Sequence, residues 1–110
     1  MQNGLYAAEF QTPLGMGYGV VMLLNGVLQG GDTMMYYQGN YTVDGSSFKA
    51  EVKTGAHAHP PGMTSVFGRD RVTIDLSGTF AGDTLTANGK AAEVPNVNFN
   101  AKLKLIAVGS

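Results

Sequence analysis

Hydrophobic and polar residues alternate with a period of two over most of this chain. In the segment 47–53, for example, Phe48, Ala50 and Val52 are separated by lysine and glutamate. This is the side-chain repeat of a β-strand with one buried and one solvated face. The segments 5–11, 71–80 and 97–105 show the same alternation. The pattern predicts antiparallel strands that each place one face in a core.

One segment departs from this alternation. Gly17 to Leu24 is nearly all apolar and is followed by Asn25-Gly26. Asn-Gly suits the two central positions of a type I′ turn, both of which need a positive φ. We therefore predict a hairpin in which Val27 to Gln29 forms the second strand. The glycines at 15, 17 and 19 would share one face, where a curling sheet needs room.

Other glycine-containing dipeptides divide the rest of the chain. Gly30-Gly31-Asp32 predicts a bend or bulge, and Asp44-Gly45 a second hairpin turn. Gly82-Asp83 predicts a turn into a short strand at 84–87, which would be followed by a loop containing Pro95. A strand rich in tyrosine is expected at about 34–43.

These segments amount to about eight short strands, and none has a convincing helical period. Tight hairpins of this kind favour a meander closed on itself or a sandwich. Closure removes the exposed edges, so we predict an all-β fold, a small closed antiparallel barrel of about eight strands. With 110 residues, the chain is expected to form a single domain over 1–110.

Composition and charge narrow the classes of partner. Seven basic and eight acidic residues give a formal net charge of -1, which offers no attraction for a nucleic-acid backbone. The chain has no cysteine, which excludes disulfides and suits a reducing compartment. The N-terminus lacks the features of a signal peptide, and the longest apolar run is too short to span a bilayer. We expect a cytoplasmic protein that does not insert into a membrane.

The connection from Gly55 to Asp70 is the only one long enough to act as a lid or recognition loop. It contains His57, His59 and Phe67, all of which we consider as ligand or interface residues. His-x-His on an extended segment aims both rings to one side, as in many metal sites. Pro60-Pro61-Gly62 follows in place of an acidic ligand, so surface histidines are favoured, and no metal or other cofactor is expected.

Tyrosine and methionine supply the remaining candidates. Tyr18, Tyr37 and Tyr41 each combine an apolar ring with a polar tip, which suits a ligand pocket or a dimer interface as well as ordinary packing. Met35 is an adaptable filler, for which core packing is favoured over a binding surface. No serine, histidine and acid combination and no carboxylate pair stands out, so we expect a protein that is not an enzyme.

Several of these motifs together resemble the GrlR-type family of small bacterial proteins, whose named member is a negative regulator of type III secretion. The similarity covers the first 45 or so residues best. Its motifs are Gly4-Leu-Tyr, Gly17-x-Gly-Val, Asn25-Gly26, Gly30-Gly31-Asp32 and Tyr37-Gln-Gly-Asn-Tyr.

The resemblance implies a lipocalin-like barrel, a homodimer and a cytoplasmic protein that binds a transcriptional activator. It also implies an apolar small molecule as a ligand. The family's regulator engages its partner through the acidic run Glu-Asp-Glu-Asp, just after the tyrosine-rich strand. Here the corresponding residues are Thr42-Val-Asp-Gly-Ser-Ser, in which only Asp44 is acidic. The activator-binding residues therefore do not carry over.

Two functions follow as hypotheses. The first is a non-enzymatic regulatory or protein-interaction module, for which the resemblance is the main support. The second is a carrier or sensor of a small apolar ligand, with the connection 55–70 as its lid. This alternative predicts an internal cavity of roughly a few hundred cubic ångströms, the usual scale of ligand pockets.

Overall fold

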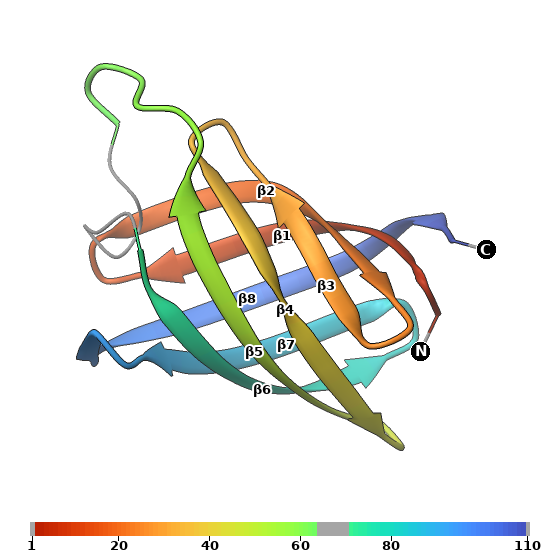
Figure 1. Cartoon of the computed structure of the whole chain (residues 1–110). Coiled ribbons are helices and arrows are strands. Elements are labelled where there is room, and N and C mark those ends of the chain that lie inside the picture. The colour runs from red at the N-terminus through yellow and green to blue at the C-terminus, as the bar shows by residue number, and fades with distance from the viewer. Residues whose placement is uncertain (1, 64–70, 110) are drawn as a thin grey trace.

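Eight antiparallel strands close into a barrel in the computed structural model, which describes residues 2–63 and 71–109 (Figure 1). Each strand pairs with its neighbours in sequence, and β1 pairs with β8 to close the sheet. The predicted all-β closed meander is confirmed. The strands are β1 (Gly4–Thr12), β2 (Gly15–Leu24), β3 (Val27–Gly31), β4 (Met35–Asp44), β5 (Ser47–Ala56), β6 (Thr73–Ala81), β7 (Thr84–Ala91) and β8 (Val94–Val108).

The alternation in the sequence selects the inward-facing residues as predicted. Phe48, Ala50 and Val52 are buried on β5, and Lys49 and Glu51 between them are exposed. Aromatic rings from neighbouring strands pack against one another at one end of this core. The ring of Phe48 stacks on Tyr41 at 5.5 Å and meets Phe80 edge-on at 5.7 Å. Such contacts stabilise the barrel beyond the burial of their area.

The predicted hairpin between β2 and β3 is confirmed. Leu24 pairs with Val27, and the two residues between them have positive φ values, 50° at Asn25 and 86° at Gly26. The side chain of Asn3 fixes this turn from outside: its Oδ1 accepts the Asn25 N–H at 3.1 Å, and its Nδ2 donates to Asn25 Oδ1 at 3.0 Å. The turn is therefore tied to the start of the chain.

The bend predicted at Gly30-Gly31-Asp32 is present but begins only at Asp32, because β3 continues through both glycines and pairs them with Val21 and Val20. A Cβ added at Gly30 would collide with the carbonyl oxygen of Val20. Glycine here serves the close approach of two strands. The chain turns immediately afterwards, at Asp32 to Met34.

The loop predicted around Pro95 is wrong. Strand β7 extends to Ala91, and β8 already begins at Val94. The register between β7 and β8 shifts between Lys90 and Ala91, which leaves Pro95 in an irregular part of the ladder. Proline cannot donate to a regular ladder but is tolerated at such irregularities.

The two ends of the described chain meet at one end of the barrel. The Gly109 N–H donates to the Asn3 carbonyl oxygen at 2.7 Å, and the C-terminal end of β5 lies at the opposite end of the barrel (Figure 1). Residues 2–63 and 71–109 contain no helix long and apolar enough to cross a membrane.

Candidate functional site

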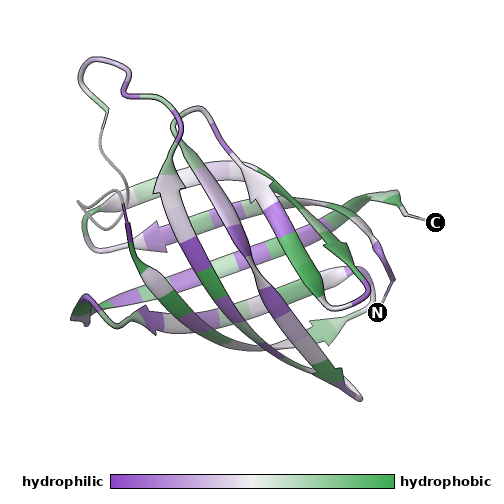
Figure 2. Ribbon diagram, in the orientation of Figure 1, coloured by the Kyte–Doolittle hydropathy of each residue, from purple (hydrophilic) through white to green (hydrophobic). Residues whose placement is uncertain are grey.

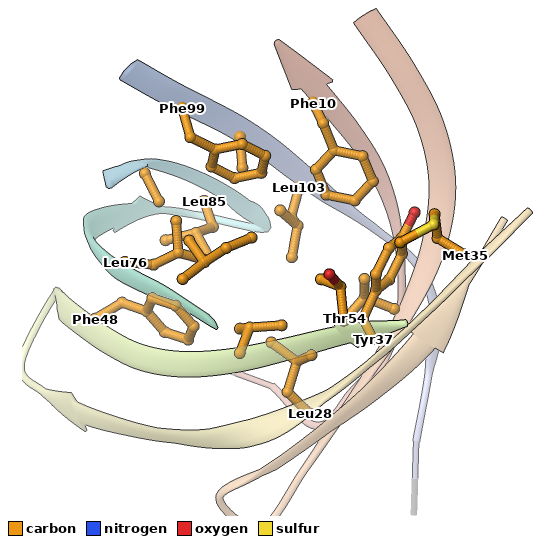
Figure 3. A pocket seen from close by; sticks show the side chains of 15 residues that line it. Phe10, Leu28, Met35, Tyr37, Phe48, Thr54, Leu76, Leu85, Phe99 and Leu103 are labelled. Atoms are coloured by element: carbon orange, nitrogen blue, oxygen red, sulfur yellow. The ribbon is translucent and has the colours of Figure 1, made fainter. Parts of the chain in front are cut away.

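A small apolar cavity lies inside the barrel, between the inward-facing side chains (Figure 3). Among the described residues that line it, only Thr54 and Tyr37 contribute hydroxyl groups. The lining residues are Phe10, Val21, Leu28, Met35, Tyr37, Phe48, Val52, Thr54, Ile74, Leu76, Leu85, Ala87, Phe99, Ala101 and Leu103.

The free space in this cavity is limited. A water-sized molecule has about 60 Å³ available to it there. Three aromatic rings fill much of one side: Phe10 meets Tyr37 edge-on at 5.2 Å and stacks with Phe99 at 5.8 Å. The cavity is thus smaller than the few hundred cubic ångströms expected for a carrier. A larger ligand would require these side chains to move.

Tyr37 carries the main polar contact of the cavity wall. Its hydroxyl donates to Asp32 Oδ2, while Asp32 Oδ1 accepts the N–H groups of Met34 at 2.9 Å and Met35 at 2.7 Å. Burial, and then the hydrogen bond to the Asp32 carboxylate, raises the pKa of the Tyr37 phenol above its ordinary value of 10.0. Gly19 gives this hydroxyl room, because a Cβ there would lie 3.2 Å from it.

His57 joins the same loop to the end of β5. Its Nε2 donates to the Asp32 carbonyl oxygen at 2.8 Å, and its backbone N–H donates to the Met34 carbonyl oxygen, also at 2.8 Å. The β3–β4 loop is therefore fastened both to the barrel wall, through Tyr37, and to the segment after β5. Within residues 2–63 and 71–109, no group of three or more histidine or acidic residues is placed to hold a metal ion.

The outer surface of β2 is a second candidate site. Its outward side chains are all apolar or aromatic, and they expose between 37% and 68% of their residues' surface. Figure 2 shows the C-terminal end of β2 and the start of β3 as hydrophobic. We call this surface the β2 face, and it comprises Met16, Tyr18, Val20, Met22 and Leu24.

The neighbouring strands first extend the β2 face and then border it with polar groups. Leu5 on β1 lies beside Met22, and Val27 on β3 lies beside Leu24. On the same strand as Leu5, Glu9 lies directly beside Tyr18. The polar neighbours on either side include Gln11 beside Met16 and Gln29 beside Met22. An apolar centre with a polar border is the usual anatomy of a protein–protein interface.

The predicted site residues fall into separate places. Tyr18 lies on the β2 face, 68% exposed, whereas Met35 and Tyr37 line the cavity. Tyr41 is buried and stacked on Phe48.

The histidine-containing connection is only partly described. His57 and His59 are exposed just after the C-terminal end of β5, and Phe67 lies outside the described residues. The structure therefore brings Met35, Tyr37 and His57 to one end and places Tyr18 on the outer wall.

The core packing favoured for Met35 is confirmed, because Met35 is buried, as is Met34. Met16, Met22 and Met63 are exposed instead. The sequence feature that points to these exposed residues is the uninterrupted apolar run of β2. A barrel strand with one solvent-facing side should alternate between apolar and polar residues. An unbroken run in such a strand leaves apolar side chains outside.

The sequence matches no protein-family model, and a search of curated proteins finds no match either.

Proposed function

We propose that this protein is a non-enzymatic protein-interaction module that regulates a partner by binding it through the β2 face. The observation that carries the proposal is the row of five exposed apolar side chains from Met16 to Leu24 on one strand. Large apolar or aromatic side chains have on the order of 200 Å² of surface, so this row presents roughly 500 Å². Patches of that size on soluble proteins are often functional.

The composition of the face supports a protein partner. Aromatic residues and methionine are enriched at the centres of interfaces, and charged residues are depleted there. The β2 face contains Tyr18, Met16 and Met22 and no charged residue. Tyr18 is the most exposed of the five, and its ring can bury a large area while its hydroxyl stays at the rim.

The sequence resemblance to the GrlR-type family supports a regulatory role in the cytoplasm. It does not support the family's acidic contact, because Thr42 and Val43 are exposed at the end of β4 and only Asp44 is acidic there. The proposed interface therefore lies on a different strand from the one that the resemblance suggests.

Affinity capture from the native cell tests this function. A partner recovered with the wild-type chain is expected to be lost when Tyr18→Glu places a charge on the β2 face. The control is Thr79→Glu, an exposed outward position on β6. Equal recovery with both variants would contradict the proposed interface, provided that circular dichroism shows both to be folded.

A second candidate function rests on the apolar cavity. We propose a carrier or sensor of a small apolar molecule as the alternative, because the cavity wall is almost entirely hydrocarbon. The available 60 Å³ limits such a ligand to a very small molecule, or requires Phe10 and Tyr37 to swing aside.

Filling the cavity distinguishes the two functions. Ala101 lines it from β8, and Ala101→Leu would occupy part of the free space. For a carrier, native mass spectrometry should show a bound molecule on the wild-type chain and none on this variant. Partner capture by the variant should stay unchanged if the interaction function is correct.

A further inference from the structure

A polar groove runs over the outer surface of strands β4, β5 and β6, which lie side by side in the barrel wall (Figure 1). We propose that this groove binds a neutral oligosaccharide, and that one sugar ring stacks on Tyr36. The inference goes beyond the proposed function, because the groove shares no residue with the β2 face. We call it the β4–β6 groove, and its main residues are Tyr36, Gln38, Asn40, Glu51, Lys53 and Asp75.

Two hollows make up the groove, and both are lined by Asn40 and Glu51. The first hollow extends from these residues to Tyr36 and has a volume of about 340 Å³. The second reaches Asp75 on β6 and has a volume of about 350 Å³. Each volume is on the scale of small-molecule sites, roughly 300–1,000 Å³. Because the hollows adjoin across three strands, they suit a linear chain of sugar units.

Tyr36 forms a flat apolar end of the groove. It pairs with Gly55 on β5, and its ring lies across that glycine, because a Cβ added there would collide with the ring atoms. Gly55 is buried, whereas Tyr36 remains 43% exposed. The ring is therefore held against the sheet without a ligand and still presents surface to solvent. The face of an aromatic ring is electron-rich and attracts polarised C–H groups, which a sugar ring carries on its flat side.

The polar side chains beside Tyr36 can both donate and accept hydrogen bonds. Gln38 lies opposite Lys53 in the β4–β5 ladder. Asn40 lies opposite Glu51 in the same ladder. The two amides supply donors and acceptors, the ammonium group only donates, and the carboxylate only accepts. Within residues 2–63 and 71–109, none of these four side chains is engaged in a hydrogen bond or ion pair, so all four are available to sugar hydroxyls.

The charges of the groove favour a neutral ligand. Glu51 lies between Lys49 and Lys53 along β5, and Asp75 lies opposite Glu51 on β6. The two lysines and the two acidic residues balance, so the groove has no net charge to attract an ion. A sulfated or phosphorylated ligand would meet both carboxylates, and a cationic ligand would meet both lysines. A ligand that offers only hydroxyl groups avoids both conflicts.

Titration with neutral oligosaccharides tests the groove directly. Tyr36→Trp would carry the only tryptophan of the chain, and it keeps an aromatic ring over Gly55. Its fluorescence should change on titration with at least one of cellotetraose, maltotetraose and chitotetraose, with a dissociation constant of about 1 mM or below. In NMR spectra of the wild-type chain, the same sugar should shift the side-chain amide signals of Gln38 and Asn40.

Three variants, compared with the wild-type chain by calorimetry, identify the residues involved. Tyr36→Leu still covers Gly55 but removes the aromatic face, so it should weaken binding at least about tenfold. Asn40→Ala removes hydrogen bonds from the centre of the groove and should weaken binding about fivefold. Tyr18→Leu makes the same change as the first variant on the β2 face and should leave binding unchanged. Circular dichroism checks that all three are folded.

The opposite results would overturn the inference. One is that none of the three sugars binds at about ten times the expected dissociation constant. Another is that Tyr36→Leu and Tyr18→Leu weaken binding equally. Binding of heparin alone would contradict a neutral ligand. Loss of a captured protein partner in Tyr36→Leu, without any sugar binding to the wild-type chain, would make the groove a protein interface instead.

Discussion

The Tyr37 hydroxyl donates a hydrogen bond to the Asp32 carboxylate, five residues back in the chain and across the β3–β4 loop. The same carboxylate accepts the N–H groups of Met34 and Met35. One acidic side chain therefore holds both the turn of this loop and an aromatic ring in the cavity wall.

Removing the Tyr37 hydroxyl should destabilise the fold. Tyr37→Phe keeps the ring but leaves Asp32 without one donor, and hydrogen bonds to charged groups contribute about 1.5–3 kcal/mol. We expect the free energy of unfolding, measured by urea denaturation, to fall by roughly that amount. Tyr36→Phe is the matched control, because Tyr36 points outward from the adjacent position. Equal losses in the two variants would contradict this role for Asp32.

Alkaline pH should weaken the fold through the same group. The pKa of the Tyr37 phenol is raised in the folded state, so above the ordinary tyrosine pKa of 10.0 the unfolded chain loses this proton first. Stability from this group is complete below pH 10.0 and declines as the pH rises further. The urea midpoint should be lower when measured at about pH 11 than at about pH 8, and this difference should be smaller in Tyr37→Phe.

Part of the alkaline decline should remain in that variant. Burial raises the pKa of the Tyr6 phenol as well, and its hydroxyl donates a hydrogen bond to the Gln2 carbonyl oxygen at 2.6 Å. A Tyr37→Phe chain whose decline equals that of the wild type would show that the Tyr37 phenol does not contribute.

Adding a methyl group at Gly39 should be costly. A Cβ there would collide with the carbonyl oxygen of Glu51 on the neighbouring strand β5. Overpacking of this kind costs about 1–3 kcal/mol, so Gly39→Ala should lower the thermal midpoint clearly. Asn40→Ala, at the next and exposed position, should change it little. A tolerated Gly39→Ala would mean that β4 and β5 can separate at this point.

Two substitutions at Asn25 should separate backbone strain from side-chain bonding. Asn25→Gly relieves the positive φ of 50° but removes the side-chain bond from Asn3. Asn25→Ala removes the same bond but keeps a side chain at a positive φ. It should therefore lower the free energy of unfolding by about 1 kcal/mol more than Asn25→Gly does. Thermal melts should therefore rank the wild type and the glycine variant above the alanine variant. The reverse order of the two variants would exclude strain as the cause.

The sequence predicts most of the barrel because nearly every strand has one side in solvent and one in the core, so that its polar and apolar residues alternate. Alternation identified Phe48, Val52, Ile74 and Phe99 as inward-facing residues, and all four are buried. Two local details could not be predicted because the sequence does not show which strand lies beside which. The bend at Gly30-Gly31-Asp32 begins only at Asp32, because Gly30 packs closely against Val20, and Pro95 lies in β8 rather than in a loop, because the β7–β8 register shifts there.

The candidate sites were less predictable than the fold. The apolar run of β2 was visible, but its closeness to Leu5 and Val27 depends on pairing with β1 and β3. The bond from Tyr37 to Asp32 spans only five residues, yet it requires the loop to fold back. Neither arrangement follows from spacing along the chain.

The meeting of Asn3 with Gly109 has a practical consequence. Asn3 also holds Asn25, so both ends of the described chain lie next to Leu24 and one edge of the β2 face. A bulky fusion attached at either end would compete with whatever occupies that face. A rearranged chain with the present ends joined by a short linker, opened instead at the Gly45-Ser46 turn, would move the attachment point away. Its binding should then match that of the untagged chain.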